Sequence, residues 1–153
     1  MKDRKLTTLE IGRDLMGKLN RKGIKCSKQK IQNLLYLSQI WHLELYNNPL
    51  FEDDIYALKE GPGAYTIWKL KKGCSQLDGD ELNSDLLRSI VNYYGIMDVD
   101  FLSKLTKDTY AWKKQISNNG FGDTSSISIE LLKDTSRFKE KEVHKRFIEN
   151  IKN

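Results

Sequence analysis

The sequence predicts a mostly α-helical fold, built as one compact domain over residues 1–153 with at most a small β-ribbon near residues 50–60. Three observations support this. Thr, Ser or Asp residues precede several amphipathic stretches, as N-caps precede helices. One long stretch is apolar on nearly all sides, which is typical of a central, buried helix. The length suits a single domain, and neither a repeat nor a linker interrupts it.

The first helix is expected to begin at Thr7 or Thr8 and to end near Lys22, with Gly23 as its stop. Ser27 caps a second helix over about 28–46, where Ile31, Leu34, Leu35, Trp41 and Leu45 trace one apolar face and Tyr36, Leu37 and Ile40 make the other side apolar too. Because a helix that is apolar all round must be covered by others, we predict that it forms the core.

The middle of the chain is less regular. Residues 47–49, Asn-Asn-Pro, end the second helix, and residues 50–59 read as extended chain with a short turn. Gly61-Pro62-Gly63 predicts a tight turn, and a helix is expected over about 64–71.

The second half returns to helices. One is expected over about 82–94, and two short ones follow Asp98 and Thr109. A charged C-terminal helix is expected over 128–151, with residues 137–146 exposed to solvent.

Composition limits the class of protein. The two cysteines, Cys26 and Cys74, are far apart in the sequence and have no ligand spacing, so we expect reduced thiols and no disulfide. The N-terminus shows no signal sequence, and no apolar run reaches the length of a membrane span. These features point to the cytoplasm and to folding that needs neither metal nor an oxidised cysteine pair.

Catalytic chemistry has little support in the sequence. His42 lies in the apolar second helix and is expected to be buried and hydrogen-bonded, whereas His144 lies among charges and is expected to be exposed. Phosphate-binding glycine loops, a nucleophile elbow and metal-ligand spacings are all missing from the pattern. We therefore predict no catalytic residues, no metal, no cofactor and no enzymatic activity.

Charge is concentrated at the N-terminus. Residues 1–30 hold ten Lys or Arg and three Asp or Glu, although the whole chain carries only +5. A basic segment suits an acidic partner, either nucleic acid or protein. A nucleic-acid-binding regulator, acting on a mobile element or on its own operon, is therefore one candidate function; a solvated helix face is the alternative interpretation of the same charges.

A series of short motifs in fixed order resembles the Panacea domain family, which comprises the phage-associated GepA- and SocA-like proteins. The family pattern is similar to K-L-Q-K-L-L-Y, then P-L-F, I-x-A-x-x-x-G-P, L-S-x-x-T-H and W. The matching segments are Lys30-Ile-Gln-Asn-Leu-Leu-Tyr36, Pro49-Leu-Phe51, Ile55-Tyr-Ala57 with Gly61-Pro62, Leu102-Ser-Lys-Leu-Thr106 and Trp112, within a resemblance over about 8–138.

The resemblance implies an antitoxin of a bacterial or phage toxin–antitoxin system, which binds a co-encoded protein toxin directly and holds it inactive. Some members are similar to protease adaptors that deliver the toxin for degradation. The chain departs from the family pattern at Lys107, where the family has His, at Leu58, where it has an aromatic residue, and at Gly63, where Val is common. The glycine is expected to loosen the turn.

Two sets of residues follow from these motifs. We expect Leu34, Tyr36, Gly61, Pro62 and Trp112 to determine the fold. We expect Tyr65, Trp68 and Lys69, just beyond the Gly-Pro segment, to contact the partner, because exposed aromatic and basic side chains dominate protein interfaces.

Overall fold

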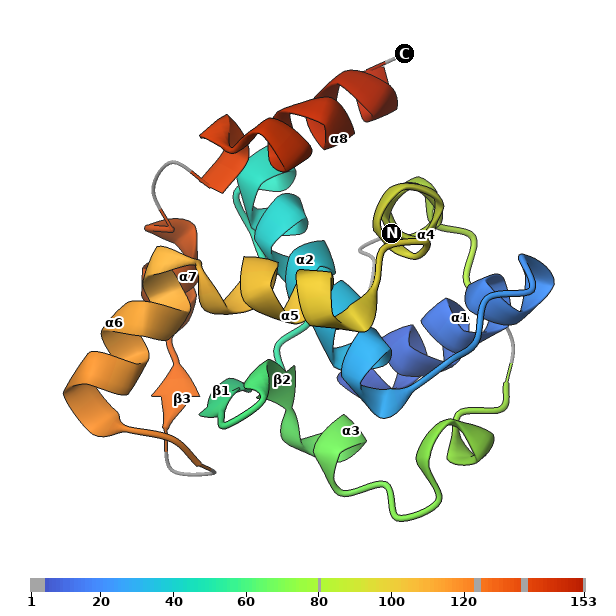
Figure 1. Cartoon of the computed structure of the whole chain (residues 1–153), viewed down its shortest axis with the longest axis horizontal. Coiled ribbons are helices and arrows are strands. Elements are labelled where there is room, and N and C mark those ends of the chain that lie inside the picture. The colour runs from blue at the N-terminus through green and yellow to red at the C-terminus, as the bar shows by residue number, and fades with distance from the viewer. Residues whose placement is uncertain (1–4, 80, 123–124, 136–137, 153) are drawn as a thin grey trace.

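Helix α2 (Lys28–Tyr46) runs through the middle of the molecule, as the sequence predicts (Figure 1). The computed structural model describes residues 5–79, 81–122, 125–135 and 138–152. The Ser27 hydroxyl caps α2 by accepting a hydrogen bond from the Lys30 amide at 3.1 Å. Asn47 ends the helix in the left-handed conformation, with φ of 58°. Leu34 and Tyr36 are fully buried, so their predicted place in the core is confirmed.

The remaining helices pack around α2 (Figure 1). They are α1 (Thr8–Arg21), α3 (Tyr65–Trp68), α4 (Asp85–Tyr94), α5 (Val99–Lys107), α6 (Tyr110–Asn119), α7 (Ile129–Lys133) and α8 (Glu142–Lys152), with short 3-10 turns η1 (Gly73–Gln76) and η2 (Phe138–Glu140). This confirms the predicted mostly α-helical fold.

Helix α4 begins later than predicted because Leu82 is held elsewhere. The Leu82 amide donates to Asp14 at 2.6 Å, and its carbonyl accepts from Lys18 at 3.0 Å. Asp14 and Lys18 form a buried ion pair on α1 at 2.5 Å. Because both backbone groups of Leu82 are bound to α1, the helix starts after the Ser84 cap instead.

A small antiparallel sheet occupies the predicted ribbon region and extends beyond it. Strand β1 (Ile55–Leu58) pairs with β2 (Gly61–Ala64) in a register that joins Ile55 to Ala64, and β3 (Ser126–Ile127) pairs with the other edge of β1. The turn lies at Lys59 and Glu60, so the prediction of a turn at Gly61-Pro62-Gly63 is wrong. Pro62 is accommodated because β2 is an edge strand.

Two glutamines of α2 bind the backbone of the irregular middle segment. Gln32 accepts from the Ala64 amide at 2.8 Å and donates to its carbonyl at 2.9 Å. Gln39 accepts from the Leu50 amide at 2.8 Å and donates to the Phe51 carbonyl at 2.9 Å. These buried amides satisfy groups that a sheet would otherwise pair.

The C-terminal region is divided, so a single helix over 128–151 is not observed. Helices α7 and α8 are separate, and residues 136 and 137 between them lie outside the described residues. Phe138 and His144 are buried, so the expectation of a fully solvated 137–146 segment is also wrong. The reason is that α8 packs across the end of α2, with Phe147 4.7 Å from the Trp41 ring.

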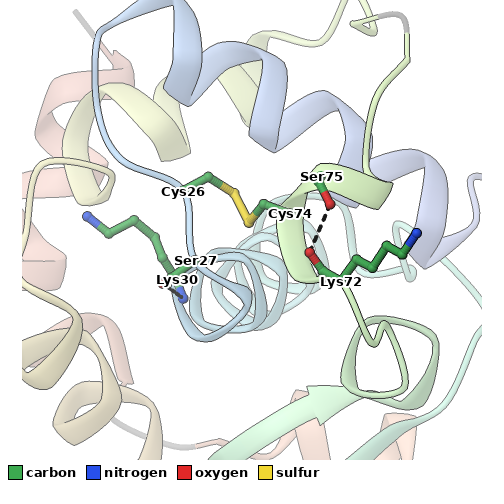
Figure 2. The surroundings of a disulfide bond; sticks show 6 residues. All are labelled: Cys26, Ser27, Lys30, Lys72, Cys74 and Ser75. Atoms are coloured by element: carbon green, nitrogen blue, oxygen red, sulfur yellow. Dashed lines mark hydrogen bonds between the residues drawn. A yellow bond between two sulfur atoms is a disulfide. The ribbon is translucent and has the colours of Figure 1, made fainter.

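Cys26 and Cys74 form a disulfide, which corrects the prediction of two reduced thiols (Figure 2). Their Cα atoms are 6.3 Å apart although 48 positions separate them in sequence. The bond joins the chain just before α2 to η1. Disulfides persist in oxidising surroundings, so the cysteines give no support to the inference of a cytoplasmic location. Among the described residues, no helix is long and apolar enough to cross a membrane.

Candidate protein-interaction surface

The short helix α3 turns its two middle side chains, Thr66 and Ile67, toward the protein and leaves its two end residues, Tyr65 and Trp68, exposed. Ile67 is fully buried, and its Cδ1 lies so close to Gly12 of α1 that a Cβ there would come within 2.9 Å. The Thr66 hydroxyl lies 2.6 Å from the Thr8 hydroxyl, which ties α3 to the start of α1. These two anchors leave Tyr65 and Trp68 facing solvent.

Helix α3 is shorter than the predicted helix over 64–71 because its C-terminal carbonyls are bound by another element. The Lys28 ammonium, at the start of α2, donates to the carbonyls of Trp68 and Leu70, each at 2.8 Å. Orphan carbonyls at a helix end need such partners. The disulfide lies just beyond, where η1 meets the segment before α2 (Figure 2).

The three residues expected to contact a partner form one exposed group. Tyr65 is 39% exposed and Trp68 50%, and their rings stack with centroids 5.5 Å apart. The Lys69 ammonium lies 5.7 Å from the centre of the Tyr65 ring, which is within the range of a cation–π contact. The structure thus brings Tyr65, Trp68 and Lys69 together at the surface; their role stays a prediction.

These aromatic side chains border two hollows. One, of about 390 Å³, is lined by Leu58, Lys59, Glu60, Tyr65, Trp68, Phe121 and Gly122. The other, of about 300 Å³, is lined by Lys28, Gln29, Gln32, Leu58, Glu60, Gly61 and Trp68. Trp68 and the β1–β2 turn separate them. We call Leu58, Lys59, Glu60, Tyr65, Trp68, Lys69 and Phe121 the Trp68 surface.

Phe121 was missed by sequence reasoning, although it is 52% exposed and completes the wall opposite Trp68. Its ring lies 6.0 Å from that of Trp112. Trp112 therefore supports the surface as well as helix α6, and its Nε1 is buried without a hydrogen-bond partner in the described part of the chain. The sequence did carry a signal that could have identified Phe121: it is the one apolar side chain in an otherwise polar and glycine-rich loop, Asn118-Asn-Gly-Phe-Gly122.

Gly61, at the edge of the second hollow, has φ of +135°, a conformation that side chains rarely adopt. Pro62 and Gly63 follow it as buried parts of β2. A Cβ on Gly63 would lie 2.7 Å from Cδ of Gln32. The glycine here thus makes room for the glutamine that binds Ala64, which corrects the expectation that it loosens a turn.

His42 has the predicted hydrogen bond but is less buried than predicted, whereas His144 is buried and not exposed as predicted. His42 is half-buried, and its Nδ1 lies 2.7 Å from the Asn48 carbonyl. His144 is fully buried, and burial lowers its pKa to about 4. Tyr94 accepts a hydrogen bond from Trp41 Nε1 at 2.9 Å, and its hydroxyl also forms a hydrogen bond with Nδ1 of His144 at 2.9 Å. Within the described ranges, no three His, Cys, Asp or Glu side chains are grouped to hold a metal ion.

Together these features define a mostly helical domain with an exposed aromatic and basic surface beside a small sheet. The family model for the antitoxin SocA-like, Panacea domain matches residues 31–113. The chain belongs to this family, which confirms the resemblance carried by the motifs. No curated protein and no solved structure matches the chain.

Proposed function

We propose that this protein is an antitoxin that neutralises a co-encoded protein toxin by forming a direct, stoichiometric complex with it, without turnover of its own. Membership of the antitoxin SocA-like family is the observation that carries the proposal. The match covers α2, the β1–β2 hairpin, α3, α4, α5 and the start of α6. It therefore includes most of the elements that build the Trp68 surface.

The toxin binds at the Trp68 surface in this proposal. Tyr65, Trp68 and Phe121 are large aromatic side chains that remain substantially exposed around a hollow, and exposed aromatic residues are enriched among the hot spots of interfaces. The backbone of Tyr65 and Trp68 is held in place, since Gln32, Lys28 and Thr8 form hydrogen bonds with residues 64, 68 and 66. A preorganised surface loses little conformational entropy on binding, which favours a tight complex.

The nucleic-acid alternative receives less support because many cations of residues 1–30 are engaged within the protein. Lys18 pairs with Asp14, Arg21 pairs with Glu81, and Lys28 binds the end of α3. Lys30 is buried and donates to the carbonyls of Gly95 and Met97 at 2.6 and 3.0 Å. Cations committed to internal partners contribute little to phosphate binding.

The experiment is co-expression with the product of the adjacent gene. That product should be lethal alone and harmless with this protein. Trp68→Ala should weaken rescue and raise the Kd of the purified pair by about 30-fold or more, since truncating a hot spot costs about 2 kcal/mol or more.

Tyr46→Ala is the matched control for this experiment. Tyr46 is 58% exposed at the C-terminal end of α2, so this substitution removes an exposed aromatic ring that lies outside the Trp68 surface. Equal loss of rescue in both variants, or full rescue by Trp68→Ala, would exclude the Trp68 surface as the toxin site.

A further inference from the structure

We propose that the Trp68 surface selects an acidic segment that presents an apolar side chain: glutamates or aspartates of the partner meet the lysines of this surface, and the apolar side chain enters the hollow between Trp68 and Phe121. This rests on the proposed function, since it specifies the chemistry of the toxin at that site. Two independent features of the surface, its charge and its apolar lining, carry the inference.

The charge around the two hollows is one-sided. Lys59 and Lys69 are exposed, Lys28 lines the second hollow, and a Cβ on Gly61 would lie 3.7 Å from Cγ of Lys107. Glu60 is the one carboxylate in the two linings. In the part of the chain that the structure describes, none of the four lysines forms an ion pair. The Lys28 ammonium is already bound to the carbonyls of Trp68 and Leu70. The charges of Lys59, Lys69 and Lys107 are therefore the ones available to an incoming partner.

The apolar part of the surface lies beside these charges. Leu58, Tyr65, Trp68 and Phe121 line the 390 Å³ hollow, and the three aromatic side chains are 39–52% exposed while Leu58 is buried. An apolar side chain bound there is desolvated on several faces at once, while the lysines at the rim remain in solvent. This arrangement of apolar centre and charged rim is the usual anatomy of a protein interface.

Single-stranded nucleic acid is the other acidic polymer that aromatic and basic residues can bind, and the geometry disfavours it. Base stacking needs free ring faces. One face of Tyr65 is covered by Trp68, and Lys69 lies over the ring. Glu60 lines both hollows, where it would repel phosphates. A protein segment can avoid Glu60 because its carboxylates are spaced by side chains that carry no charge.

The test measures association by biolayer interferometry with three forms of the full-length protein. Glu60→Gln removes the one carboxylate of the linings and should tighten binding roughly two- to fivefold. The pair Lys59→Glu with Lys69→Glu should slow association about tenfold and reduce its dependence on salt. The control pair is Lys22→Glu with Lys145→Glu, which makes the same change in net charge at exposed sites on α8 and at the end of α1.

Two probes separate this inference from the proposed function. The first is the purified product of the adjacent gene. The second is a synthetic peptide in which glutamates flank a Leu-Phe-Leu core, compared with the same peptide carrying lysines instead. The inference is supported if the acidic peptide binds, if Glu60→Gln tightens its binding, and if the Lys59→Glu and Lys69→Glu pair slows its association. This holds even if the gene product does not bind.

The opposite results would overturn it. One such result is that the gene product binds and Trp68→Ala weakens its binding, but Glu60→Gln also weakens binding. Another is that the two lysine pairs have the same effect. In either case the antitoxin proposal holds and the inference of an acidic partner is wrong. Preference for the lysine peptide, or tighter binding of an oligothymidine than of the acidic peptide, would also exclude it. Circular dichroism of each variant checks that the fold is retained.

Discussion

Gly61 shows how one residue sets the geometry of the hairpin. Lys59 and Glu60 form the turn with ordinary negative φ, so the positive φ that closes the hairpin falls on Gly61. The structure places the residue in a strand rather than in the predicted turn, and its fold-determining role stays a prediction. Its backbone conformation, more than the space around it, restricts what can replace it.

Gly61→Val should therefore destabilise the protein by about 1–3 kcal/mol, because a β-branched residue at this φ is strained. The loss should be visible as a lower Tm in thermal unfolding. Lys59→Val is the control, since it places the same side chain two residues earlier at negative φ. Unchanged stability with lost toxin binding would instead make Gly61 a contact residue.

His144 makes the stability of the protein depend on pH. Its pKa falls from 6.5 to about 4 in the folded protein because burial disfavours the charged form and Lys141 adds a like charge. The unfolded chain binds the proton below pH 6.5 and the folded protein does not. Stability should thus be highest above about pH 6.5 and fall by about 3 kcal/mol as the pH drops to about 4.

Urea denaturation at a series of pH values measures this effect. His144→Gln should flatten the profile between pH 4 and 6.5, since the amide can still form a hydrogen bond with the Tyr94 hydroxyl and does not titrate. His42→Gln is the matched control: burial also lowers the pKa of His42, but the ring stays half exposed, so its removal should change the profile less. An unaltered profile in His144→Gln would show that other groups cause the dependence.

At the scale of elements, the disulfide joins the segment before α2 to η1, close in sequence to the contact by which Lys28 holds the end of α3. Cys26 lies two residues before Lys28, whose ammonium binds the end of α3. Cys74 lies in η1, which follows α3 by a few residues. The bond thus closes a loop that contains α2, the hairpin and α3.

Reduction should lower stability by about 4 kcal/mol, because the bond removes chain entropy from the unfolded state over a loop of this length. The measurement is thermal unfolding with and without dithiothreitol. The double variant Cys26→Ser with Cys74→Ser should match the reduced protein and gain no further sensitivity to the reductant. If the wild type unfolds identically in both conditions, the pairing makes no contribution to stability.

At the scale of the whole molecule, the Trp68 surface is assembled from three separated segments. The β1–β2 turn, α3 and the loop after α6 each supply part of it, and α2 holds the two ends of α3 through Gln32 and Lys28. A surface built on so many supports is suited to binding a partner without rearrangement.

We expect the protein to act by occupancy, so toxin neutralisation should saturate near equal amounts of the two proteins. The measurement is titration of purified toxin activity, together with the mass of the complex. A standard interface buries roughly 800 Å² on each partner, which a domain of this size can supply. Neutralisation at strongly substoichiometric amounts would indicate turnover or a recycling protease adaptor instead.

The sequence by itself determined the features that arise from neighbouring residues. The Ser27 hydroxyl caps α2, the apolar pattern of 28–46 marks the core helix, and the ordered motifs identify the family. Tyr65 and Trp68 could also be recognised as surface candidates, because they follow the Gly-Pro segment closely. Caps and periodicity act within a few residues, so they can be read without knowing the rest of the fold.

Only the tertiary structure decided the features that need distant partners. Cys26 meets Cys74, His144 is buried against Tyr94, Ser126–Ile127 pairs with β1, and Phe121 faces Trp68 across a hollow. Each depends on segments that are far apart in the chain, and nothing in the local pattern specifies which segments meet. Burial, and with it the pKa of His144 and the pairing of the cysteines, is a property of the packed molecule because it is set by whatever covers the residue.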